Sequence, residues 1–497
     1  MVERSVIVIG AGLAGLSAGC YAQMNGYRTR IFEQHTRPGG VCTAWKRKGY
    51  TIDGCIHWLM GCMPGSSFCR LYQEVGALDG NRLIPVDHLV RLVDEVSGQR
   101  LEITADLDRL AADMKALAPQ DGRVIDELLE GVRAFRGFEW ALGEPAELAG
   151  PLAGLKQMWR MRRWLKYLTR YNMSVATFAQ RIQSPFLRWA VTNVFLPEMP
   201  VSFLLILLAQ LAAGELAIVE GGSLEFALAV ARRYRELGGL VTYDAPVEEI
   251  LVEDGRAVGV RLADGSRYRA DVVVSAADGY STIFQLLGGR YVDGPIRERY
   301  ERWALFRPLL IVSLGVACTF PDQPSETMLR LQRPLSVAGQ EVDGLMLRIF
   351  NRDLTLAPQG KTVVQALMET DFADWCDLQK ERSRYEAEKE RVAAQVRERL
   401  EAHLPGLSAK VEMTDVATPY TLWRYTRNHR GSYEGWLMTP EQVGKPVPKT
   451  LPGLKNFYMA GQWVEPGGGI PPALYSGRQA VQLICHQDGV PFSTRVL

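Results

Sequence analysis

Residues 5–33 read SVIVIGAGLAGLSAGCYAQMNGYRTRIFE, and this stretch decides the fold of the chain. The apolar run SVIVI predicts a buried parallel strand, LSAGCYAQMNGY predicts a helix, and TRIFE predicts a second strand. Between the first strand and the helix, Gly10, Gly12 and Gly15 follow the spacing GxGxxG. The sequence therefore predicts a βαβ unit of the dinucleotide-binding type.

The three glycines have separate roles in such a turn. Gly10 makes the tight turn, Gly12 lets the backbone approach a pyrophosphate, and Gly15 lets the helix pack closely on the strand. The start of the helix, at Leu13 and Ala14, presents free N–H groups and the positive end of the helix dipole to phosphate oxygens. The alternative is a glycine-rich turn in some other α/β protein, which the flanking strand, helix and acidic residue disfavour.

An acidic residue stands where a nucleotide ribose is expected. Glu33 ends the second strand, 18 residues after Gly15, and its carboxylate can accept hydrogen bonds from ribose hydroxyls. A carboxylate here disfavours a 2′-phosphate, and Gln34 beside it is also expected to contact the cofactor. Up to this point the pattern fits either NAD or FAD.

The segment after the second strand favours FAD. Gly39 and Gly40, followed by Val41, lie where many flavoproteins need bare backbone against the ribityl chain and the isoalloxazine ring. Residues 33–58, EQHTRPGGVCTAWKRKGYTIDGCIHW, resemble the phytoene desaturase, carotenoid isomerase and retinol saturase group of flavoproteins, within the amine oxidase superfamily. This resemblance implies FAD as the cofactor.

Three further blocks extend the resemblance, in the order and at the spacing of that group. They lie at residues 219–239, 401–436 and 457–480. The first block resembles the glycine turn and helix that precede the adenine-side strand. That strand is expected at residues 241–250, with Val247 in the position that packs on adenine.

The last block resembles a C-terminal flavin motif, in which a strand ending at Gly461 meets the N-terminus of a helix. Gly467, Gly468 and Gly469 leave no side chain where backbone must approach a ring. Ile470 and the two prolines after it suit the first turn of a helix. N–H groups of that turn can stabilise negative charge on a reduced flavin. A purely structural glycine loop is the alternative for this motif alone.

The resemblance implies an α/β fold with a Rossmann-like FAD-binding domain of the glutathione-reductase type and an inserted α+β substrate domain. At 497 residues, two joined domains are also expected from length. The FAD-binding domain is expected to comprise residues 1–80, 215–290 and 405–497. The substrate domain is expected to comprise residues 81–214 and 291–404.

Motifs that do not occur restrict the redox chemistry. No second GxGxxG follows a strand, which disfavours a separate NAD(P)H domain. Electrons are therefore expected to pass through oxygen, a quinone or a bound donor. No cysteine lies between Gly461 and Ile484, so we expect FAD to be bound non-covalently.

Four cysteines cluster near the second glycine loop: Cys42, Cys55, Cys62 and Cys69, with His57 among them. A structural metal site usually uses shorter C-x₂-C pairs, whereas six residues separate the last three cysteines from one another. We therefore expect no metal, and small buried thiols around the flavin.

Charge and hydropathy limit the partners. Lys and Arg number 57 against 56 Asp and Glu, which gives a net charge of +1 and no general attraction to nucleic acid. The apolar run at residues 201–214 is shorter than a spanning helix and is stopped by Glu215. With too short an apolar run at its start for a secretory signal, the chain is expected to be cytoplasmic.

A basic, aromatic helix is expected at residues 155–171, LKQMWRMRRWLKYLTRY. Such a helix can lie in a bilayer interface, with cations on the headgroups and rings at the acyl boundary. Peripheral contact with the inner membrane face is therefore one hypothesis. A solvated charged face packed over the domain is the other.

The reaction class follows from the resemblance, which implies desaturation, saturation or cis/trans isomerisation of a long apolar isoprenoid. His57 and Glu465 are the catalytic candidates, as proton donor or acceptor near the flavin. A hydrogen-bonded core histidine and a helix-capping carboxylate are the alternatives. Two other functions remain open: an amine or porphyrinogen oxidase of the same fold, and a non-enzymatic prenyl-binding escort protein.

Overall fold

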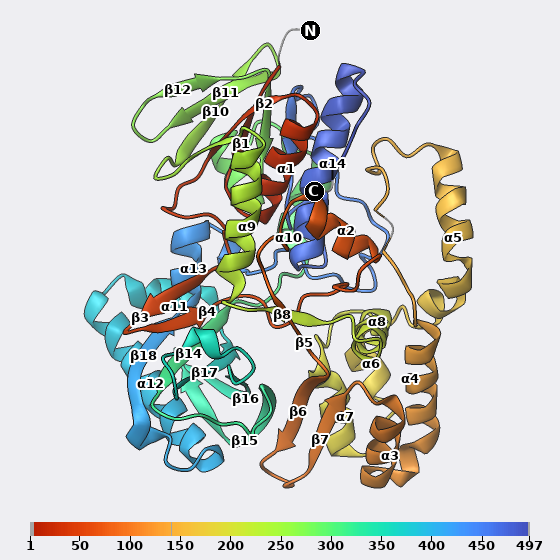
Figure 1. Cartoon of the computed structure of the whole chain (residues 1–497), viewed down its shortest axis with the longest axis vertical. Helices are drawn as coiled ribbons and strands as arrows, with labels where there is room; N and C mark the ends of the chain where they lie inside the picture. The colour runs from red at the N-terminus through yellow and green to blue at the C-terminus, as the bar shows by residue number, and fades with distance from the viewer. Residues whose placement is uncertain (1–3, 141, 496–497) are drawn as a thin grey trace.

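The computed structural model of the chain describes residues 4–140 and 142–495, apart from the side chains of residues 151–158. Two large sheets organise it, one parallel and one mixed (Figure 1). In the view of Figure 1 the parallel sheet lies in the upper half of the molecule and the mixed sheet in the lower half. The predicted α/β fold class is confirmed.

The parallel sheet joins strands from the two ends and the middle of the chain. Its strands, in spatial order, are β19 (Phe457–Met459), β13 (Val272–Ser275), β1 (Ser5–Ile9), β2 (Arg28–Phe32) and β9 (Leu240–Thr242). The helices that pack on one face are α1 (Leu13–Met24), α9 (Ser223–Glu236) and α14 (Ile470–Asp488). The antiparallel strands over the other face are β10 (Val247–Glu253), β11 (Arg256–Leu262) and β12 (Arg267–Arg269).

The strand β1 shows why this sheet is buried on both sides. Its side chains alternate between the two faces, as in any strand. Val6 and Val8 pack into the apolar core under the helices, whereas Ile7 and Ile9 pack against β10–β12. A continuous apolar run without polar alternation is therefore what this position requires.

One predicted strand is wrong. Residues 241–250 were expected to form a single strand, but the structure divides them between β9 and β10, which belong to different sheets. Asp244 has φ of 51°, in the left-handed region, and Pro246 follows it. Because this conformation and the missing proline N–H both interrupt a ladder, the chain turns here.

Helices pack on one face of the mixed sheet, and a further group of helices packs against its edge at β6 (His88–Asp94) and β7 (Arg100–Thr104). The strands of the sheet, in spatial order, are β18 (Val411–Ala417), β14 (Leu309–Val316), β17 (Thr362–Glu369), β16 (Gln340–Ile349), β15 (Glu326–Val337), β6 and β7. The helices on its face are α11 (Phe372–Gln379) and α12 (Arg382–His403). The helical group comprises α3 (Leu107–Leu117), α4 (Gly122–Ala134), α6 (Val175–Ala179), α7 (Pro185–Val194) and α8 (Val201–Ala212).

Short elements complete the fold. Two small antiparallel sheets pair β3 (Ala44–Arg47) with β4 (Tyr50–Asp53), and β5 (Leu83–Pro85) with β8 (Ala217–Val219). The remaining α-helices are α2 (Ser67–Glu74), α5 (Pro151–Arg170), α10 (Gly294–Arg302) and α13 (Pro419–Thr426). The helix α5 runs along the outer edge of the molecule, at the right of Figure 1.

The domain boundaries stay a prediction. The parallel sheet takes its strands from residues 5–32, 240–275 and 457–459, and the mixed sheet takes its strands from residues 88–104 and 309–417. One difference stands out: β18 follows the predicted boundary at residue 405, yet it pairs with β14 in the mixed sheet.

Candidate active site

A large cavity lies between the two sheets, with a volume of about 1790 Å³. Ligand pockets are usually about 300–1,000 Å³, so this cavity has room for more than one ligand. The glycine loops after β1, β2 and β19 all contribute to its wall. Ligands of open parallel sheets bind outside the carboxyl ends of the strands, which is where these loops lie.

Fourteen of the predicted cofactor-binding residues line this cavity. They are Gly10, Gly12, Leu13, Ala14, Glu33, Gln34, Gly39, Gly40, Val41, Val247, Gly461, Gly468, Gly469 and Ile470. Gly15 lies behind the wall, where a Cβ atom would be 2.0 Å from the carbonyl oxygen of Gly10. The structure thus brings the separated motifs together and assigns Gly15 a packing role.

The first glycine loop ends in an uncapped helix. Gly12 is the N-cap of α1 and provides no side-chain hydrogen bond, so the first N–H groups of the helix have no cap. A Cβ atom on Gly12 would meet no atom within 4 Å, because the cavity lies beside it. Uncapped N–H groups and the helix dipole suit an anionic phosphate group at this position.

The second glycine loop is joined to the first. The Gly39 N–H donates to the carbonyl oxygen of Ala11 at 2.9 Å, and Gly12 and Gly39 form a parallel bridge. Gly39 and Gly40 have φ of 115° and 60°, which favour glycine. Backbone from two loops, without side chains, therefore borders the same part of the cavity.

Glu33 is buried, and its carboxylate fixes the first loop. Oε2 accepts from the Ala11 N–H at 2.6 Å and Oε1 accepts from the His35 N–H at 2.8 Å. Burial raises the pKa of Glu33, while these backbone N–H groups act in the opposite direction. A carboxylate has about four acceptor positions, so lone pairs remain for ribose hydroxyls.

The C-terminal motif forms the third glycine loop. Gly461, Gly468 and Gly469 have φ of 104°, 72° and 94°, and Gly469 is the N-cap of α14. Two prolines occupy the first turn of this helix and donate no N–H. Only the Ile470 N–H of that turn is then available to a negative charge, which is fewer donors than the motif alone implied.

These features fit a flavin dinucleotide. The uncapped start of α1 suits the pyrophosphate, the free lone pairs of Glu33 suit the ribose, and the loops at Gly40 and Gly468 leave space against the ring. We therefore take the side of the cavity bordered by the three glycine loops as the cofactor side.

The other side of the cavity is apolar. The side chains there come mainly from α7, α8, the segment between them and the mixed sheet. They include Trp140, Phe195, Leu196, Met199, Phe203, Ile206, Leu207, Met328, Met346 and Leu367. The helix α8 is almost wholly buried, so its apolar sequence serves both the core and the cavity wall.

His57 lies in the cavity wall, in the loop after β4. Burial lowers the pKa of His57 well below its usual range, and the Arg348 guanidinium lowers it further. The imidazole is therefore neutral at pH 7, with one ring nitrogen able to accept a proton. Nδ1 lies 3.9 Å from Oε2 of Glu326.

Glu465 also lines the cavity, but its charge is paired. The buried Lys449 ammonium donates to its Oε2 at 3.1 Å. One oxygen of the carboxylate is therefore occupied by the ion pair. The catalytic assignments of both Glu465 and His57 stay predictions.

Glu434 is a candidate that the sequence did not suggest. Its carboxylate lies against the third glycine loop, since a Cβ atom on Gly468 would be 2.5 Å from its Oε2. It has no hydrogen-bond or ion-pair partner among the residues that the structure describes. Burial raises the pKa of Glu434 to about 7, the range of a general acid or base at neutral pH. Nothing in the local sequence SYEGW signals this, because the burial comes from distant segments.

The clustered cysteines are free thiols. Cys42 and Cys55 line the cavity, while Cys62 and Cys69 do not belong to its wall. A hydrogen bond with the neighbouring Cys55 thiol, followed by burial, holds the pKa of Cys42 well above its usual range. Within residues 4–140 and 142–495, no group of three or more His, Cys, Asp or Glu side chains is arranged to hold a metal ion.

Comparison with known proteins gives one family and several relatives. A profile described as flavin containing amine oxidoreductase matches residues 13–485. The chain is 25% identical to the chloroplastic prolycopene isomerase of Arabidopsis thaliana, over 99% of this chain and 84% of that protein. It is 26% identical to the lycopene-forming phytoene desaturase of a Paracoccus species, over 97% of each chain.

Solved structures show the same fold. An oxidoreductase from Methanosarcina mazei has a TM-score of 0.59 at 18% identity, over 96% of this chain and 100% of that one. Putrescine oxidase has a TM-score of 0.57 at 14% identity, over 97% and 99% of the two chains. Identities at this level carry the fold alone.

Proposed function

Because the chain belongs to the flavin containing amine oxidoreductase family, we propose that this FAD-dependent oxidoreductase acts on a long apolar isoprenoid of the carotenoid type. The observation that carries the proposal is the continuous cavity of about 1790 Å³, which joins the three glycine loops to the apolar wall. A dinucleotide and a long apolar chain can share this volume, since it exceeds the usual range for one ligand.

Different groups of residues have different roles in this proposal. The glycine loops and Glu33 bind and orient the cofactor, and the side chains of α7 and α8 bind the apolar chain and exclude water. The bound flavin supplies hydride transfer to or from carbon. In this proposal Glu434 and His57, which line the same cavity, hold or move a proton. We propose that FAD is bound without a covalent bond and exchanges electrons with oxygen, a quinone or a bound donor.

The substrate class is tested with the purified, FAD-loaded protein. Phytoene and prolycopene, each in lipid vesicles, are incubated with it and the pigments are separated by chromatography. We expect one of them to be converted to a product with a different number or geometry of double bonds. Putrescine, cyclohexylamine and protoporphyrinogen are tested in parallel by oxygen consumption, and oxidation of these alone would overturn the isoprenoid assignment.

The apolar character of the proposed substrate suggests that the protein contacts a membrane, and α5 is the candidate contact. Trp159 is 65% exposed, and Arg160, Arg162, Arg163 and Lys166 are exposed cations without a carboxylate partner among the described side chains. The guanidinium of Arg162 lies over the Trp159 ring at 4.0 Å. No helix in residues 4–140 and 142–495 is long and apolar enough to cross a membrane. We propose that this face docks on an anionic bilayer surface.

Replacing those four cations of α5 with Gln is expected to weaken binding to vesicles that contain phosphatidylglycerol by at least about tenfold, because each cation near an anionic surface contributes about 1 kcal/mol. Co-sedimentation measures the effect. The expected position of the helix also includes Lys156 and Met158, whose side chains lie outside the described residues.

A matched control removes four exposed cations from the opposite part of the molecule. These are Arg256 of β11, Arg267 of β12, Arg397 of α12 and Lys410, just before β18; like the four cations of α5, they have no carboxylate partner among the described side chains. The control is expected to bind the vesicles like the unmodified protein. Equal losses in the two variants would point to net charge alone and would contradict docking through α5.

A further inference from the structure

A second, much smaller cavity lies behind His57. Its volume is about 40 Å³, and its lining includes His57, Glu326, Arg348 and His88. His57 lines both this cavity and the large one, so the imidazole stands between them. A water molecule needs about 10–15 Å³ by this measure, so there is room for about three waters.

Two buried polar atoms in the lining have no protein partner. These are Oε2 of Glu326 and Nδ1 of His88, judged within the part of the chain that the structure describes. The other carboxylate oxygen of Glu326 accepts from Arg348 Nε at 2.9 Å. Because a buried polar atom without a partner costs about 1–3 kcal/mol, polar cavities with such atoms bind water.

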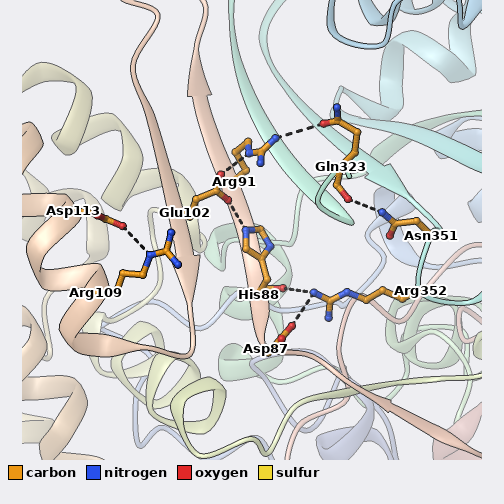
Figure 2. Close-up of polar contacts among 9 residues, drawn as sticks. All are labelled: Asp87, His88, Arg91, Glu102, Arg109, Asp113, Gln323, Asn351 and Arg352. Carbon is orange, nitrogen blue, oxygen red and sulfur yellow. Dashed lines mark hydrogen bonds and ion pairs between the residues drawn. The ribbon is translucent and has the colours of Figure 1, made fainter. Parts of the chain in front are cut away.

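On its other ring nitrogen, His88 contacts Glu102, as Figure 2 shows. Its Nε2 lies 2.5 Å from Oε2 of Glu102, across the pair of strands β6 and β7. Glu102 also accepts from Arg91 Nε at 2.6 Å. The side chain of Glu102 is 26% exposed, so its carboxylate reaches solvent.

We infer that the small cavity holds water and that Glu326, this water, His88 and Glu102 form a proton path between His57 and solvent. The path goes beyond the proposed function, but it rests on it in one respect: His57 must exchange a proton with the reaction in the large cavity. The distance of 3.9 Å from His57 Nδ1 to Glu326 Oε2 suits a link through a small rotation or one bridging water.

The proton balance along the path is simple. In the outward direction, His57 passes one proton to the Glu326 carboxylate, which passes one to the water. The water gives a proton to Nδ1 of His88, whose Nε2–H passes one to Glu102 and then to bulk water. Each side chain returns to its starting charge, and no electrons move. A histidine with partners at both ring nitrogens is suited to such a relay.

The charges around Glu326 make it able to carry protons in both directions. Burial raises the pKa of Glu326 to about 7, while the Arg348 guanidinium acts to lower it. Near pH 7 the carboxyl therefore exists in both forms. The other charged side chains that line the small cavity are Asp53, Arg352 and Asp353. Arg352 donates to Asp87 and to the carbonyl oxygen of His88, which holds the outer wall (Figure 2).

The first experiment measures how fast the Glu326 carboxyl exchanges its proton, without any turnover. The infrared carbonyl stretch of protonated Glu326 is identified by its loss in Glu326→Gln, and its shift on transfer to D₂O is timed in the holoenzyme. We expect His88→Gln to slow this exchange by at least about tenfold, because glutamine cannot pass a proton on. Glu102→Gln, a second variant that keeps His88, is also expected to slow it.

The matched control is His403→Gln. His403 Nε2, at the end of α12, forms a similar pair at 2.7 Å with Oε1 of Glu95, which follows β6 at the opposite end of that strand from His88. We expect this variant to leave the Glu326 exchange unchanged. Equal exchange rates in the unmodified protein, His88→Gln and Glu102→Gln would overturn the path.

The second experiment separates the path from the proposed function. Proton uptake during photochemical reduction of the bound flavin is followed with a pH indicator dye, in His57→Asn and His88→Gln, with and without added imidazole. Slow uptake in both variants that imidazole restores supports the whole path. If His88→Gln slows carboxyl exchange but His57→Asn leaves proton uptake and turnover unchanged, the path stands and the proposed role of His57 falls.

Discussion

Gly12→Val is expected to abolish FAD binding while the protein still folds. The loss of affinity should be at least about a thousandfold, or ~4 kcal/mol. A Cβ atom on Gly12 meets no protein atom within 4 Å, and the residue has φ of −65°, which valine adopts without strain. The added side chain therefore enters only the space that the pyrophosphate needs at the start of α1.

Titration of the apoprotein with FAD, followed by flavin fluorescence, measures this effect. Thermal unfolding of the apoprotein should change little. Gly294→Val is the matched control, because Gly294 also has no atom within 4 Å of a Cβ and begins the remote helix α10. Tight FAD binding by Gly12→Val would contradict the placement of the pyrophosphate on the first glycine loop.

Glu434→Gln is expected to lower turnover of the identified substrate by about 10²–10⁴, the usual contribution of a general acid or base. Its carboxylate is unpaired within the described residues and lies against the third glycine loop. Glu465→Gln is the matched control, since its carboxylate is already paired with Lys449, and we expect a loss of less than about tenfold. A larger loss in Glu465→Gln than in Glu434→Gln would reverse the two assignments.

The pH dependence provides a second readout for Glu434. Because its pKa in the folded protein is raised to about 7, the turnover profile should change near pH 7, and this change should vanish in Glu434→Gln. The same pKa shift also predicts the direction in which the stability of the protein changes with pH. A carboxyl whose pKa is higher in the folded than in the unfolded protein contributes its full stability at acidic pH, below the pKa of the unfolded state. This stability is lost as the pH rises through about 7. The apoprotein of Glu434→Gln should therefore unfold at a higher temperature than the unmodified apoprotein at pH 8, and not at pH 4.

Much of the cofactor side of the fold could be predicted from the sequence. It is built from short segments whose backbone conformation allows only certain residue types. The run SVIVI has to be a strand buried on both faces, and Gly15 has to lack a side chain, since any Cβ atom would overlap the carbonyl oxygen of Gly10. Glu33 follows the second strand directly. The continuous strand at residues 241–250 was wrong because Asp244 and Pro246 interrupt it, and the apolar pattern does not show where a strand changes sheet.

The amino-acid sequence by itself determined the βαβ unit, the glycine loops and the carboxylate at Glu33, because these depend on residues close together in the chain and on backbone conformation. Only the tertiary structure decided which acids can titrate near pH 7. Desolvation by residues from distant segments raises the pKa of Glu434 and of Glu326 to about 7. A pKa depends on desolvation and on neighbouring charges in space, and neither quantity is a property of the local sequence.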